Sequence, residues 1–137
     1  MSTYIDTSVV VSFFIQDDHA DAARRWARTD PSVAISDWTA TEFSSALSHH
    51  VRLGSLSDRE RKAAELAFDR WAMRGVVLEV ARERFQDARI LMQGHRRLRA
   101  PDALHLAIAR HEGLPLATLD HDLRDAAVAE GLKVVDL

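Results

Sequence analysis

The sequence contains no cysteine, and only five glycines and three prolines occur among its 137 residues. The absence of cysteine excludes disulfides, thiolate zinc sites and cysteine nucleophiles. Neither glycine-rich phosphate-binding pattern, G-x-G-x-x-G or G-x-x-x-x-G-K-[ST], is present, which argues against nucleotide binding. No uncharged run approaches the roughly 20 residues of a membrane helix, and the start of the chain does not resemble a signal peptide. We therefore expect a soluble, cytoplasmic protein with no membrane partner.

Hydrophobic residues make up 47% of the chain, so a sizeable core can form. The length suits one domain of ordinary size, and we expect residues 1–137 to form a single domain. The net charge of -3 neither suggests nor excludes a nucleic-acid partner, because local patches of charge would decide such binding.

Short apolar runs alternate with longer segments of helical period, and this alternation is typical of a parallel sheet covered by helices. The sequence therefore predicts an α/β fold with a central, mainly parallel sheet of about five strands. The expected strands are Tyr4–Ile5, Val33–Ile35, Val76–Leu78, Leu116–Leu119 and an edge strand Lys133–Leu137.

Helical periodicity, capping residues and helix-ending glycines predict the segments between the strands. A capping box at Ser57–Glu60 begins one helix, and Pro101 begins another that is apolar nearly all round and therefore central. The other expected helices are Ser8–Phe14, His19–Thr29, Thr39–Leu53, Ala81–Gln93 and His121–Glu130.

Four acids lie where an α/β fold forms its ligand sites. Asp6 follows the first apolar run, and Asp120 follows the fourth. Glu42 lies early in the helix after the second run, and Asp102 lies in the first turn of the central helix. Ligand sites of open parallel sheets form outside the carboxyl ends of the strands, so these placements allow four carboxylates to converge.

Four carboxylates at one place would repel one another strongly without a cation. Mg²⁺ prefers oxygen ligands of this kind, and Mn²⁺ can take its place. Such an ion polarises a phosphoryl oxygen and activates a water for attack on a phosphate ester. The residues therefore predict a Mg²⁺ or Mn²⁺ site for phosphoester hydrolysis.

Each acid also has a simpler explanation when it is taken alone. Asp102 can be a first-turn charge that the helix dipole favours, and Asp120 can be the N-cap of the last helix. Glu42 can be a solvated residue beside a buried stripe. Asp6 is the hardest to explain in this way, because a carboxylate that follows a buried run needs a partner.

The sequence resembles the PIN-domain family in an ordered set of motifs. They are Tyr4-Ile5-Asp6-Thr7-Ser8, Glu42, Ala100-Pro101-Asp102-Ala103 and Ala117-Thr118-Leu119-Asp120. It is most similar to the VapC-type toxin ribonucleases of toxin–antitoxin pairs. The resemblance implies a three-layer α/β/α sandwich and a metal-dependent endoribonuclease. It also implies a homodimer that a small antitoxin neutralises. The catalytic, metal-holding positions are then Asp6, Glu42, Asp102 and Asp120.

Three further residues belong to the expected surroundings of the metal. The resemblance places Ser8 and Thr118 where hydroxyls orient the ligating carboxylates. Asp122 is an extra acid that could assist the metal, or a solvated first-turn residue. His105 shares a helical face with Asp102, and we expect it to be packed or hydrogen-bonded rather than a proton carrier.

RNA contact requires basic residues near the acids. Arg96, Arg97 and Arg99 lie just before Asp102 and are the candidates, although an ordinary solvated loop explains them equally well.

Two other functions compete with the nuclease. A haloacid-dehalogenase-like phosphatase also places an aspartate after strand one, but it needs a second acid two residues later, where this chain has Ser8. A catalytically silent PIN fold that binds RNA or protein is the other, and the presence of all four acids argues against it.

Overall fold

The computed structural model describes residues 1–137 and contains a fully parallel sheet of four strands in the order β3-β2-β1-β4. The strands are β1 (Thr3–Ile5), β2 (Val33–Ser36), β3 (Val76–Leu78) and β4 (Leu116–Ala117). The prediction of a parallel α/β sheet is confirmed, with four strands in place of about five.

The prediction of an edge strand over Lys133–Leu137 is wrong. Only an isolated parallel bridge joins Val134 to Leu116, and a two-residue β4 offers too short an edge for a ladder. Leu119 does not extend β4 either, because its backbone N–H donates to the Ser8 hydroxyl instead of to a neighbouring strand.

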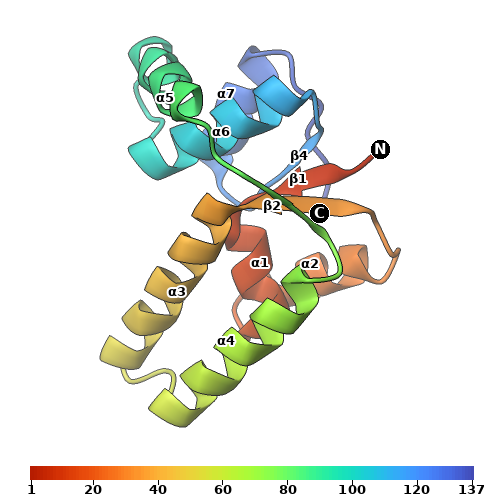
Figure 1. The fold of residues 1–137 in the computed structure, drawn as a ribbon, viewed down its shortest axis with the longest axis vertical. Coiled ribbons are helices and arrows are strands. Elements are labelled where there is room, and N and C mark those ends of the chain that lie inside the picture. The colour runs from red at the N-terminus through yellow and green to blue at the C-terminus, as the bar shows by residue number, and fades with distance from the viewer.

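Seven helices cover the sheet in two layers (Figure 1). One face carries α1 (Thr7–Phe14), α2 (Ala20–Ala27), α3 (Asp37–Arg52) and α4 (Asp58–Ala72). The other face carries α5 (Arg82–Gly94), α6 (Ala100–Glu112) and α7 (His121–Ala129). The architecture is therefore the expected α/β/α sandwich, and the observed helix ends lie close to the predicted ones. None of the seven helices combines the length and the apolar character that a membrane span requires.

Successive side chains along each strand point to opposite faces of the sheet, which divides the core into two halves. Tyr4 and Leu116 face the cluster formed with α5, α6 and α7, whereas Ile5, Ile35 and Ala117 face the cluster formed with α1 to α4. The α6 helix is buried from Ala103 through Ala109, as its apolar sequence predicts. Its first turn therefore has a fixed position beside the sheet, and Asp102 lies in that turn.

Candidate active site

The four acids can be located relative to the topological switch point of the sheet, which is the place where the strand order reverses direction. The chain passes from β1 to β2 on one side, and β4 lies on the other side of β1. The crevice outside the carboxyl ends of β1 and β4 is the place where such sheets bind ligands. Asp6 follows β1, and Asp120 follows β4 after two residues.

Asp6 is 2% exposed and is the N-cap of α1. Its Oδ1 accepts from the Ser8 hydroxyl at 2.6 Å and from the Val9 backbone N–H at 3.3 Å. Its Oδ2 accepts from the Thr118 hydroxyl at 2.6 Å. Burial raises the pKa of Asp6 above its usual range, and the hydrogen bonds from Ser8 and Thr118 oppose that rise. A carboxylate has about four lone-pair sites, so one on Oδ2 stays free.

Ser8 and Thr118 also tie β1 to the segment after β4. The Ser8 hydroxyl oxygen accepts from the Leu119 backbone N–H at 3.1 Å, and that of Thr118 accepts from the Asp120 backbone N–H at 3.0 Å. Each hydroxyl thus fixes Asp6 and the Asp120 segment together. These contacts suit residues that orient carboxylates, and their expected role beside a metal stays a prediction.

Asp102 is half-buried and has no hydrogen-bond partner for its carboxylate. Burial, followed by the negative charges of Asp120 and Asp6, raises the pKa of Asp102 to about 6. Asp102 therefore lies near enough to Asp6 and Asp120 for both to repel its charge. Asp120 caps α7 through Oδ1, which accepts from the Leu123 backbone N–H at 2.8 Å. The simple N-cap explanation is thus true of Asp120, but it uses only one of the two oxygens.

Glu42 lies in the second turn of α3, the helix that follows β2. Its Oε1 accepts from the Thr7 hydroxyl at 2.9 Å and contacts Nε2 of His105. Its Oε2 has no protein partner. The remaining contacts of His105 are a 2.8 Å hydrogen bond between Nδ1 and the Tyr4 hydroxyl, and a 3.2 Å contact between Nε2 and the Thr7 hydroxyl.

Sequence reasoning missed Thr7 and Tyr4 as parts of this site. The only available signal for Tyr4 was a polar hydroxyl in an otherwise apolar strand. His105 is 1% exposed and hydrogen-bonded, as we expected of it, but its contact with Glu42 spans 63 residues and has no signature in the sequence.

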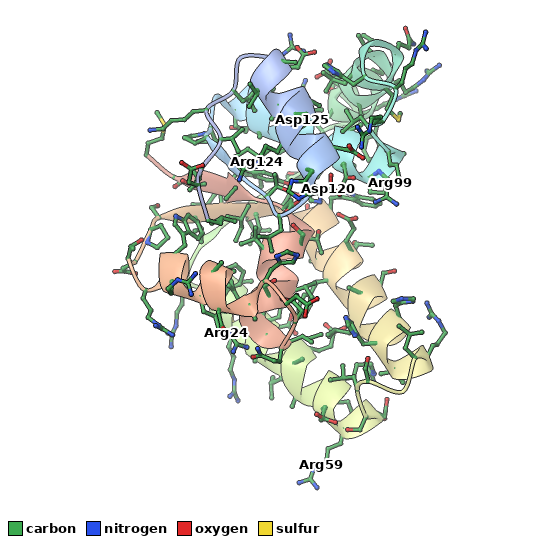
Figure 2. The ribbon with its side chains drawn as sticks, turned by 180° about the vertical axis from the view of Figure 1, so that it is seen from behind. Arg24, Arg59, Arg99, Asp120, Arg124 and Asp125 are labelled. Carbon is green, nitrogen blue, oxygen red and sulfur yellow. The ribbon has the colours of Figure 1, made fainter.

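Two of the three candidate RNA-contacting arginines flank the acids. Arg99 lies 4.0 Å from Oδ2 of Asp120, and Arg97 pairs with Asp122 at 2.9 Å. Both side chains are about 80% exposed. Figure 2 shows Arg99 beside Asp120 at the start of α7. Asp122 is turned toward Arg97, and Arg96 is exposed without an ion pair.

A pocket of about 330 Å³ adjoins this crevice, and its wall includes Thr7, Ser8, Leu119 and Asp120. A larger depression of about 590 Å³ lies elsewhere, between the β2 and β3 strands and Trp71, where no acid of the candidate site contributes.

The donor set suits a hard divalent cation. Asp6, Glu42, Asp102 and Asp120 each keep a carboxylate oxygen with a free lone pair. No group of three or more His, Asp and Glu side chains lies close enough together to hold an ion through direct bonds alone. This is compatible with Mg²⁺, which keeps several waters and needs only one or two direct carboxylates.

Comparison with known proteins shows the family. The PIN domain model matches residues 3–129. The chain belongs to the PIN domain family.

Solved structures of similar fold agree with this assignment. VapC20 of Mycobacterium tuberculosis, described as a sarcin-ricin loop cleaving toxin, is 26% identical with a TM-score of 0.75, over 99% of this chain and 100% of that one. VapBC-5 of the same organism, a toxin–antitoxin system, is 24% identical with a TM-score of 0.63, covering 99% and 98% of the two chains.

VapBC2 of Rickettsia felis, bound to a DNA fragment from its promoter, is 14% identical with a TM-score of 0.72, covering 100% and 99% of the two chains. No curated protein matches the sequence significantly.

Proposed function

We propose that this protein is a Mg²⁺- or Mn²⁺-dependent endoribonuclease and the toxin of a toxin–antitoxin pair. The observation that carries the proposal is the placement of Asp102, whose carboxylate has no hydrogen-bond partner, beside Asp6 and Asp120. Repulsion from Asp120 and Asp6 adds to the burial that raises the pKa of Asp102, and a bound divalent cation would remove that repulsion. Membership of the PIN domain family and the likeness to VapC20, described as a sarcin-ricin loop cleaving toxin, support the same function.

The proposed ligands are Asp6, Glu42, Asp102 and Asp120. When bound, the cation supplies Lewis-acid polarisation of the phosphoryl oxygen and a more acidic water. Ser8 and Thr118 hold the Asp6 carboxylate in one orientation through their 2.6 Å hydrogen bonds.

Binding of RNA places a polyanion next to a cluster of acids, so positive charge is needed at the rim. Arg97 and Arg99 supply it, because their exposed guanidinium groups lie beside the acids and present forked donors to phosphate oxygens. In the free protein they pair with Asp122 and Asp120. We infer that RNA phosphates replace these carboxylates as their partners.

A cognate antitoxin and a second copy of the chain are the proposed protein partners. Similar structures described as toxin–antitoxin assemblies support the first partner. Light scattering of the purified protein, alone and with the product of a neighbouring short reading frame, measures both associations directly.

The test is cleavage of end-labelled RNAs, including a sarcin-ricin loop hairpin, by the purified protein with Mg²⁺, with Mn²⁺ or with EDTA. We expect cleavage with either metal and none with EDTA. The Asp6→Asn variant should lose activity and stay folded, because the amide oxygen can still accept from Ser8 and Val9 while the Thr118 hydroxyl rotates to accept from the amide N–H. Asp125→Asn, on the exposed surface of α7, is the matched control. Wild-type activity in Asp6→Asn would show that the site is wrong.

The same experiment separates the two alternatives. A silent binding module would neither cut RNA nor bind Mn²⁺. A phosphatase would form a phosphoaspartate on Asp6, which trapping and mass spectrometry would detect.

A further inference from the structure

A buried polar chain lies behind Glu42, and the proposed chemistry does not use it. The Ser36 and Tyr4 hydroxyls are 2.9 Å apart, and the Tyr4 hydroxyl lies 2.8 Å from Nδ1 of His105. Nε2 of His105 then contacts Oε1 of Glu42. Tyr4, Ser36 and His105 are each at most 1% exposed. Buried polar side chains cost free energy unless they are paired. A hydrogen-bonded series of three such side chains that ends on the Glu42 carboxylate therefore indicates a function.

The contacts favour one placement of the protons on the His105 ring. Nε2 faces a carboxylate oxygen, which only accepts, so Nε2 carries a hydrogen and donates it. In a neutral imidazole Nδ1 then has none and accepts from the Tyr4 hydroxyl. The Tyr4 hydroxyl is buried between the Ser36 hydroxyl and Nδ1 of His105, so it can donate to Nδ1 while its oxygen accepts from Ser36. Tyr4 therefore selects the ring form that His105 needs to hold Glu42.

The two oxygens of Glu42 differ as a result. Oε1 receives both the Thr7 hydroxyl and Nε2 of His105, whereas Oε2 has no protein partner. The side chain is 23% exposed, so Oε2 can reach the crevice. Anchoring one oxygen of a flexible side chain leaves the other presented in one direction, which lowers the entropy lost when a ligand binds.

We propose that His105 is a positioning residue that clamps Oε1 of Glu42, with its tautomer set by Tyr4, so that Oε2 is presented to the divalent cation. The inference rests on the proposed function, since it takes Glu42 as a metal ligand. Partners that orient metal ligands typically contribute about 10–100-fold to metal affinity, and we expect His105 to lie in this range.

The first test is calorimetric titration of Mn²⁺ alone into the RNA-free protein. His105→Leu removes the donor at similar volume and should weaken Mn²⁺ binding about 10–100-fold. His105→Gln can place an amide N–H near the position of Nε2 and should recover most of that loss. His111, exposed near the end of the same helix, supplies the matched controls His111→Leu and His111→Gln, which should bind as the wild type does.

The second test is ¹⁵N NMR of the His105 ring, which distinguishes protonated from bare ring nitrogens. We expect hydrogen on Nε2 and none on Nδ1 in the wild type. Tyr4→Phe should leave Nδ1 without its donor, broaden or shift that signal and weaken Mn²⁺ binding by less than His105→Leu does. Tyr4→Phe also serves if His105→Leu fails to fold, because it removes one hydroxyl only.

The outcomes separate this inference from the function on which it rests. A wild type that neither binds Mn²⁺ nor cuts RNA would overturn the proposed function. A wild type that does both, with His105→Leu or Tyr4→Phe binding Mn²⁺ equally tightly, would overturn the clamp alone. A wild-type ring with hydrogen on Nδ1 would overturn the role of Tyr4.

Discussion

Asp102→Asn is expected to stabilise the metal-free protein at neutral pH. Asp102 holds a negative charge in a half-buried place near Asp120 and Asp6, and its pKa is raised to about 6 from 3.8. A raised carboxyl pKa means that the folded state binds the proton more tightly than the unfolded state does. The carboxyl group therefore helps folding when protonated and opposes it when ionised.

The size of the effect follows from the shift. Two pKa units correspond to about 3 kcal/mol, which screening at a half-exposed site reduces to about 1.5 kcal/mol. Asp102 lies in the first turn of α6, where the helix dipole returns about 0.5 kcal/mol to the charged form. We therefore expect Asp102→Asn to raise the stability by about 1 kcal/mol at pH 7, or the Tm by about 4 °C.

The assay is thermal unfolding in EDTA between pH 4 and pH 8. The gain should be present at pH 7 and should fade as the pH drops through about 6 toward 4, since wild-type Asp102 then takes up its proton. Added Mg²⁺ should stabilise the wild type and have less effect on the variant. Asp125→Asn is the control and should change neither. A variant less stable than the wild type at pH 7 in EDTA would refute the reasoning.

Two further changes test the surroundings of the acids. Thr118→Val removes the donor to Asp6 and leaves the Asp120 backbone N–H without its acceptor. Chemical denaturation should therefore show a free energy of unfolding lower by about 1–3 kcal/mol, and Thr118→Ser should lower it less. Arg99→Gln should weaken RNA binding and reduce the slope of log K against log salt by about 0.7, as one phosphate contact to a single strand predicts. Arg59→Gln, at the far end of α4 (Figure 2), should leave that slope unchanged, and equal slopes for both variants would exclude the proposed contact.

The sequence predicted those features that depend on local pattern and chain order. Apolar runs between helical periods defined the parallel sheet, and the capping box at Ser57 is present as expected. The positions of Asp6 and Asp120 near each other could be predicted from the sequence, because both follow strands and the carboxyl ends of parallel strands share one edge of the sheet. Their roles as metal ligands stay predictions.

Features that depend on side-chain contacts across the fold were not predictable. The apolar residues after Gly131 resemble a strand, but pairing requires a long neighbour, and β4 is only two residues long. The clamp on Glu42 joins Tyr4, Thr7 and His105, which lie on three different elements. Only the three-dimensional packing of α6 against β1 and α3 brings these groups together.

The central claim is that Asp6, Glu42, Asp102 and Asp120 share a divalent cation beside the carboxyl ends of β1 and β4. Anomalous diffraction from a crystal soaked in Mn²⁺ locates the ion without assuming any activity. The account predicts a peak at about 2.0–2.3 Å from a carboxylate oxygen of Asp6 and of at least one of the other three acids. A saturating soak that leaves this crevice without a peak, or places the ion on other residues, would contradict the account.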